Sequence, residues 1–363
     1  MKKIQMALKK ELNNYPKIKV YNQHQTKLLT LVALILLMIG LFVEYGYFST
    51  IGHLGHQIAL EILKIHLTKL LLILGFILIL DSGLTLLTPH RPKTIKQLLC
   101  HPFERPALLF GVSLILMLSL DAPVSVYCIS TVIMTVMAQL LKRKTLHFPL
   151  HPVLIGYLVG VVGTYWVNYN FGIYQTPPMF MAPFMGVSSN LGVMSFEEFS
   201  LSYYSLQTVV FGLFEGSLAG MLILPLLFSS GFLMKRQCLA FRSSGLYLLA
   251  YALISGLLLS SLHLETWVTI LFLLNGSMLM TAVFLLPEAK SLPRSNRGLV
   301  LYIIGLAALS VIFSYYVHFV FGPYLALGLF QIGLGFIRFV QMVMSSKFKK
   351  ESTTKGHSHQ VAM

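Results

Sequence analysis

The stretch that decides the fold is residues 142–208, KRKTLHFPLHPVLIGYLVGVVGTYWVNYNFGIYQTPPMFMAPFMGVSSNLGVMSFEEFSLSYYSLQT. It begins with three consecutive cations and continues through Phe-Pro-Leu-His-Pro into an apolar segment that contains three glycines. Residues 167–208 then contain no Lys or Arg. Five apolar segments precede this cation-free loop and five follow it, so the loop divides the chain into two halves.

The composition is that of a membrane protein. Of the 363 residues, 56% are hydrophobic and 11% are charged, whereas about a quarter of the residues in soluble domains are charged. Apolar runs of about 18 to 25 residues are long enough to cross a bilayer of about 30 Å as helices. Lipid offers the backbone no hydrogen bonds, so such runs predict helices instead of open sheets. We therefore expect an all-α polytopic membrane protein.

About ten transmembrane helices are expected. The apolar segments lie near residues 28–48, 67–88, 106–120, 123–141, 152–167, 209–234, 243–262, 266–286, 298–317 and 322–344. The expected organisation is a basic cytoplasmic segment (1–27), a first five-helix half (28–166), an extracytoplasmic loop (167–208), a second five-helix half (209–344) and a cytoplasmic tail (345–363).

The loops between these segments alternate in charge. Cations collect in the N-terminal segment, the tail and the loops at 89–105, 142–151, 235–242 and 287–297. The intervening loops together hold a single cation, Lys64. Because Lys and Arg concentrate in cytoplasmic loops, the alternation predicts that both termini are cytoplasmic. The same rule explains the net charge of +15, so we expect no nucleic-acid partner.

An odd number of spans in each half means that the second half enters the membrane in the opposite orientation. Inverted halves of this kind place a binding site near the membrane midplane, at their interface, where broken helices often line it. We therefore expect two inverted five-helix repeats around a shared central site.

Polar residues within the apolar segments are candidates for this site, because they are costly in lipid. Asn275-Gly276-Ser277, with Thr281 one turn later, interrupts the eighth segment. This combination suits a broken helix that offers backbone and amide groups to a polar ligand. The remaining candidates are His151, Gly156, Glu215 and Ser217. For Asp81 and Glu215, a pathway role and a structural hydrogen bond are both open.

No sequence pattern predicts a catalytic residue or a metal ligand. The histidine pairs 53/56 and 147/151 have no accompanying cluster of carboxylates or cysteines that would complete a metal or haem site. No P-loop, nucleophile elbow or dinucleotide-binding fingerprint occurs in a strand–turn–helix context. The sequence therefore does not support soluble nucleotide chemistry.

Several motifs, taken in order, resemble the RnfD/NqrB family, the membrane subunits of ion-translocating electron-transfer complexes. The resemblance runs from about residue 104 to 340 and is carried by RPALLFG (105–111), LHFPLHPVLIGY (146–157), the glycine-containing segment 212–220, GSML (276–279) and the prolines at 287 and 293. The family has Asn where this chain has His151. The family fold consists of two inverted five-helix repeats and is related to that of urea channels, in agreement with the loop charges.

The resemblance implies a multi-pass protein of the bacterial inner membrane that works with other membrane subunits of an electron-transfer complex. The family carries FMN on a Thr in a Ser-Gly-Ala-Thr segment of the outer loop. Here GVSSN (186–190) resembles that segment but has no acceptor Thr. The expected cofactor is therefore FMN or riboflavin bound non-covalently. The expected role is at most that of a non-catalytic or flavin-carrying subunit of an oxidoreductase.

The missing attachment motif leaves a second hypothesis open. A small-solute channel or transporter could use the same inverted-repeat fold without a redox cofactor. The sequence alone does not decide between electron transfer and solute transport.

Overall fold

The computed structural model describes residues 23–50, 55–86, 106–118, 122–142, 151–170, 222–236, 241–261, 273, 276–287, 292–293, 295–316 and 322–337. Within these ranges the regular structure is helical and there is no strand. The helices are α2 (Gln23–Thr50), α3 (Gly55–Leu86), α5 (Pro106–Met117), α6 (Val124–Lys142), α7 (Pro152–Asn170), α11 (Ile223–Lys235), α12 (Phe241–Ser261), α14 (Gly276–Met280), η3 (Thr281–Leu285), α15 (Asn296–Tyr316) and a last helix (Gly322–Ile337).

The helices have the length and surface of membrane helices. Four stretches are long and apolar enough to cross a bilayer: Gln25–Val43, His56–Thr85, Arg242–Ser261 and Asn296–Tyr316. Six further apolar helices among the described residues are shorter, at 10 to 17 residues. Large apolar side chains also point outward, including Ile79 (73% exposed), Leu257 (71%) and Leu301 (71%). Extensive apolar surface is unfavourable in water and favourable against lipid. The structure therefore agrees with the expected class, a helical membrane protein.

The predicted apolar segments each contain a described helix, but one boundary was wrong. The second segment was predicted near residue 67, after an outer loop at 49–66, whereas α3 already begins at Gly55. On this added part of the helix, Lys64 Nζ and Glu61 Oε1 form an ion pair at 3.0 Å. Charged residues three positions apart lie on one helix face and support the helix. Hydropathy alone therefore underestimated the length of α3.

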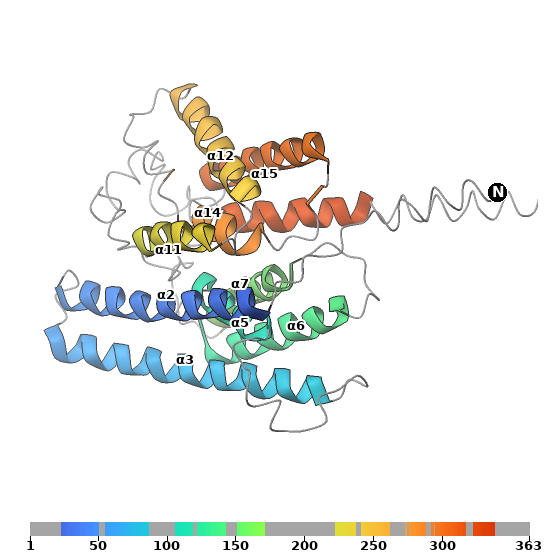
Figure 1. Ribbon diagram of the computed structural model, residues 1–363. Coiled ribbons are helices and arrows are strands. Elements are labelled where there is room, and N and C mark those ends of the chain that lie inside the picture. Colours follow the sequence, from blue (N-terminus) through green and yellow to red (C-terminus); the bar gives the residue numbers. More distant parts are fainter. Residues whose placement is uncertain are drawn as a thin grey trace, which may run out of the picture.

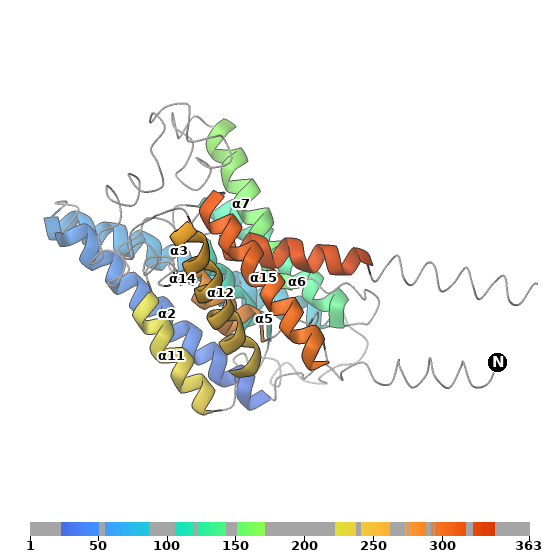
Figure 2. The same cartoon turned by 90° about the horizontal axis from the view of Figure 1, so that it is seen from above.

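The helices form two groups that lie side by side. The first group, α2 to α7, lies on one side of the molecule, and the second group, α11 to the last helix, lies on the other (Figure 1). Figure 2, seen from above, shows the second group in front of the first. In the first group, α5 contacts α2, α3, α6 and α7. In the second group, α14 contacts α11, and η3 contacts α12.

Among the described helices, the short third helix of each group is its most buried element. In α5, every residue from Ala107 to Met117 except Phe110 is buried. In α14 and η3, every residue from Gly276 to Leu285 is buried. A helix that is apolar on all sides requires neighbours on all sides. Each of these short helices therefore lies inside its own group.

In the first group, the second and fourth helices are parallel. Gln139 Nε2 on α6 donates a hydrogen bond to Asp81 Oδ1 on α3 at 3.4 Å. Lys69 Nζ on α3 lies 5.1 Å from the ring centroid of Tyr127 on α6 and donates to the carbonyl of Ala122. Both Asp81–Gln139 and Lys69–Tyr127 are separated by 58 residues. A constant separation means that α3 and α6 run in the same direction.

The second group repeats this arrangement between α12 and α15. The hydroxyl of Tyr247 donates to Ser310 Oγ at 2.9 Å, and that of Tyr251 donates to Ser314 Oγ at 3.3 Å. Both pairs are separated by 63 residues and are buried. The second and fourth helices are therefore parallel here as well. Their hydroxyl ladder satisfies polar groups that lipid could not.

The two groups meet at two places. The first helices of the groups, α2 and α11, are in contact. The fifth helices also meet: the backbone N–H of His151 donates to Gln331 Oε1 at 2.8 Å, and the rings of Tyr157 and Tyr324 are 5.2 Å apart. From the His151–Gln331 contact to the Tyr157–Tyr324 contact, the residue number rises from 151 to 157 at α7 and falls from 331 to 324 on the last helix. The fifth helices therefore run in opposite directions where they meet.

Small residues allow α6 and α7 to approach closely. Gly156, Gly160 and Gly163 lie on one face of α7 at helical spacing. A Cβ at Gly156 would lie 3.0 Å from Met134 Cβ and 3.1 Å from the carbonyl oxygen of Ser130. Glycine stripes of this kind bring membrane helices together. These three glycines therefore pack α7 against α6.

Candidate functional site

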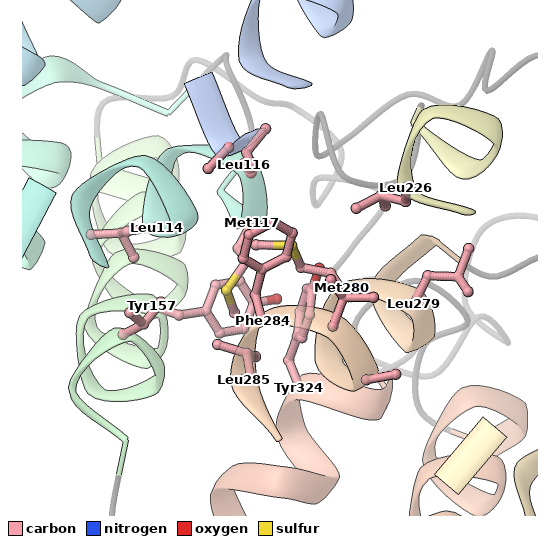
Figure 3. Packing of buried hydrophobic residues seen from close by; sticks show 14 of the residues in the cluster. Leu114, Leu116, Met117, Tyr157, Leu226, Leu279, Met280, Phe284, Leu285 and Tyr324 are labelled. Atoms are coloured by element: carbon pink, nitrogen blue, oxygen red, sulfur yellow. The ribbon is translucent and has the colours of Figure 1, made fainter. Parts of the chain in front are cut away.

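Side chains from both groups meet in an apolar and aromatic cluster at the interface (Figure 3). We define the central cluster as Met117 from α5, Tyr157 from α7, Met280 from α14, Phe284 from η3 and Tyr324 from the last helix. All five side chains are buried. The rings of Tyr157 and Tyr324 pack edge to face, with an interplanar angle of 70°.

His151 caps the N-terminus of α7. Its Nδ1 accepts a hydrogen bond from the backbone N–H of Val153 at 3.3 Å, while Pro152 occupies the first helical position. Both features are typical of helix starts. The capping bond assigns the proton of a neutral ring to Nε2.

Gly156 lies in the contact between α6 and α7. Its α-carbon faces Met134 and the backbone of Ser130, and there is little room for a larger side chain. Close helix packing is therefore sufficient to explain the glycine. The prediction that Gly156 also contacts a cofactor stays a prediction.

Ser277 and Thr281, the described candidates of the second group, are fully buried. Thr281 begins a π-helical turn in which the N–H of Leu286 donates to the carbonyl of Thr281 at 2.8 Å. The Thr281 hydroxyl has no hydrogen-bond partner in the described part of the chain, although Thr hydroxyls in helices commonly bond the preceding turn. Single π turns are frequent at functional sites. The prediction that Thr281 contacts a ligand stays a prediction.

A serine on α12 supports this π turn. The carbonyl of Ala282 would accept from the amide five residues later in a π helix, but that residue is Pro287, which has no N–H. Instead, Ser244 Oγ donates to the Ala282 carbonyl at 2.7 Å. Ser244 is fully buried. The bond therefore connects α12 to the π turn at the point where the backbone cannot supply a donor.

Ser244→Ala is expected to destabilise the protein by about 1–3 kcal/mol, because it leaves a buried carbonyl without a donor. The measurement is thermal unfolding of the purified protein in lipid nanodiscs. Ser260→Ala on the same helix is the matched control, since the exposed Ser260 hydroxyl bonds the carbonyl of Leu257 within its own helix. Equal unfolding temperatures for the two variants would contradict the assigned role of Ser244.

Sequence reasoning missed two buried polar residues on the last helix, Tyr324 and Gln331. Gln331 Oε1 accepts from the His151 backbone, whereas Gln331 Nε2 and the Tyr324 hydroxyl have no partner among the described residues. The sequence signal for Gln331 was an uncharged polar residue within an apolar segment. The same signal made Asn275 a candidate. The Gln331 side chain faces α7, and the sequence pattern alone did not reveal this.

Of the remaining candidates, one lies among the described residues and the others lie outside them. Asp81 is 4% exposed and accepts the hydrogen bond from Gln139, as the structural interpretation of this residue requires. Asn275, Glu215 and Ser217 lie outside the described residues, as does GVSSN (186–190). In the described ranges, no group of three or more His, Cys, Asp or Glu side chains could hold a metal ion.

Comparisons with known proteins do not assign the chain to a family. A scan against models of protein families gives no match, and a search of curated proteins finds no similar sequence.

Proposed function

We propose that this chain is an RnfD/NqrB-like membrane subunit that holds a flavin non-covalently between two inverted five-helix repeats. The observation that carries the proposal is the matched set of helix contacts. In both groups the second and fourth helices are parallel, and the short third helix is buried. Between the groups, first helix contacts first helix and fifth contacts fifth. A two-fold axis in the membrane plane would produce this pattern.

The proposed flavin site is the interface around the central cluster. Tyr157, Phe284 and Tyr324 supply aromatic faces that suit a flat ring. The buried hydroxyl of Thr281 and the buried amide nitrogen of Gln331 have no hydrogen-bond partner among the described residues. These residues fit a flavin ring, which has both aromatic surface and polar edges. The flavin would carry the electrons, while the protein supplies position, electrostatics and exclusion of water.

The proposed setting is the bacterial inner membrane, with both termini cytoplasmic and the cation-free loop outside. The chain itself is proposed to be non-catalytic, receiving electrons from one membrane partner and passing them to another. The alternating loop charges and the family resemblance support this setting.

The purified protein is expected to show flavin absorbance and to release FMN or riboflavin on denaturation. Thr281→Val replaces the unpartnered hydroxyl with a methyl group and is expected to weaken flavin binding about tenfold, as the loss of one hydrogen bond does. The matched control is Thr135→Val, because the Thr135 hydroxyl bonds the carbonyl of Thr131 within α6. A folded wild-type protein that releases no flavin would refute the electron-transfer proposal.

A small-solute channel or transporter is the second candidate. The observation that favours it is the outer loop, which has no acceptor Thr in the Ser-Gly-Ala-Thr context. In this case, proteoliposomes should take up urea or riboflavin, and Asn275→Ala should abolish uptake. Flavin release together with no uptake of either solute would favour electron transfer instead.

A further inference from the structure

We propose that Gln331 and Tyr324 form a donor site for an uncharged ligand with a carbonyl or amide oxygen. The site lies where α7 crosses the last helix, between the two groups. This inference rests on the proposed function, because it names the ligand chemistry of the same interface. It adds two binding residues that the sequence candidates did not include.

The orientation of the Gln331 amide is set by its neighbour. Its Oε1 accepts the backbone N–H of His151 at 2.8 Å, so its Nε2 carries two N–H donors on the other side of the amide. The side chain is fully buried, and Nε2 has no hydrogen-bond partner among the residues that the structure describes. Burial of such a group is unfavourable unless a partner compensates for the lost water. A bound oxygen acceptor would provide that partner.

Tyr324 supplies a second donor on the same face of the last helix. It precedes Gln331 by seven residues, which places the two side chains on one helix face two turns apart. Tyr324 is 1% exposed, and its hydroxyl also has no described partner. Its ring is held against Tyr157 of α7. Both donors therefore belong to the surface that the last helix presents to α7.

The chemistry of these donors limits the ligand. An amide N–H can only donate, so the ligand must present an acceptor such as a carbonyl oxygen. Among the described residues, the only buried Asp, Glu, Lys or Arg is Asp81, which accepts a hydrogen bond from Gln139 on α6. A buried ion without a nearby opposite charge is strongly unfavourable. The site therefore suits an uncharged ligand better than an anion.

Two kinds of ligand share this chemistry. A flavin has two carbonyl groups on its pyrimidine ring, and a small solute such as urea has one carbonyl group. Riboflavin and urea are therefore the two probes, because riboflavin carries no phosphate and both are uncharged. Binding of each probe is measured by equilibrium dialysis against the full-length protein in lipid nanodiscs.

Tyr324→Phe is the main test. The change removes one hydroxyl that bonds to no described residue, so the variant is expected to unfold at the wild-type temperature or higher. It is expected to weaken binding of the accepted probe about tenfold, as the loss of one hydrogen bond does. Tyr251→Phe is the matched control, since its hydroxyl bonds Ser314 on α15. The control is expected to lower thermal stability and to leave probe binding unchanged.

Gln331→Met gives a second test, because it removes both N–H donors and keeps the length of the side chain. It also removes the acceptor of the His151 N–H, so thermal unfolding is measured beside binding. It is expected to weaken binding at least as much as Tyr324→Phe. If riboflavin stays bound with wild-type affinity in both variants, the donor site is refuted while the flavin proposal survives. If no flavin binds but urea binding weakens in both variants, the donor site is supported and the flavin proposal fails. Failure of wild-type protein to bind either probe refutes the donor site.

Discussion

Gly322→Ala is expected to prevent accumulation of the folded protein. A Cβ at this position would lie 2.4 Å from the backbone nitrogen of Ser314 and 2.7 Å from the carbonyl carbon of Phe313. These neighbours are backbone atoms of α15, so no side-chain rotation can relieve the overlap. The last helix would have to move away from α15. Because whole domains are stable by only about 5–15 kcal/mol, such a displacement can exceed the available stability.

The matched control for this change lies on the same helix. A Cβ at Gly333 would meet nothing within 4 Å, and Ala favours helix by about 0.8–1.0 kcal/mol relative to Gly. Gly333→Ala is therefore expected to fold at least as well as the wild type. The measurement is the yield of monodisperse protein by size-exclusion chromatography in mild detergent. Equal yields for the two variants would show that the α15–last helix contact is described incorrectly.

Gly156→Leu is expected to have the second largest effect. The new side chain would extend from a position where even a Cβ lies 3.0 Å from Met134 Cβ and 3.1 Å from the Ser130 carbonyl oxygen. Overpacking of this kind typically costs about 1–3 kcal/mol, and more where the backbone cannot yield. Because α7 also carries Tyr157 and begins at the His151 cap, separation of α6 from α7 should disturb the interface between the groups as well.

This prediction is checked by thermal unfolding of the purified protein in nanodiscs. Gly75→Leu on α3 is the control, since a Cβ there would meet nothing within 4 Å. The control is expected to unfold close to the wild-type temperature, whereas Gly156→Leu should unfold at a clearly lower one. A stable Gly156→Leu protein that has lost only its ligand would instead favour the cofactor-binding interpretation of this glycine.

Local features of the chain were predictable because they depend on residues close together in sequence. Long apolar runs predict helices wherever lipid leaves the backbone no other partner. Pro152 after a polar residue predicts the start of α7, and the structure adds that His151 supplies the cap. The same local view explains the error at α3. The beginning of the apolar run was used to place the start of α3, whereas the Glu61–Lys64 spacing indicated that the helix had already begun.

The sequence by itself therefore determined that the protein is helical and apolar, and where nearly all of the described helices lie, because these properties follow from local periodicity and hydropathy. Tertiary structure alone decided which residues meet. It paired α3 with α6 at a separation of 58 residues and α12 with α15 at 63. It also brought Ser244 to the Ala282 carbonyl and Gln331 to His151. Contacts between distant segments depend on the packing of whole helices, which no local pattern encodes.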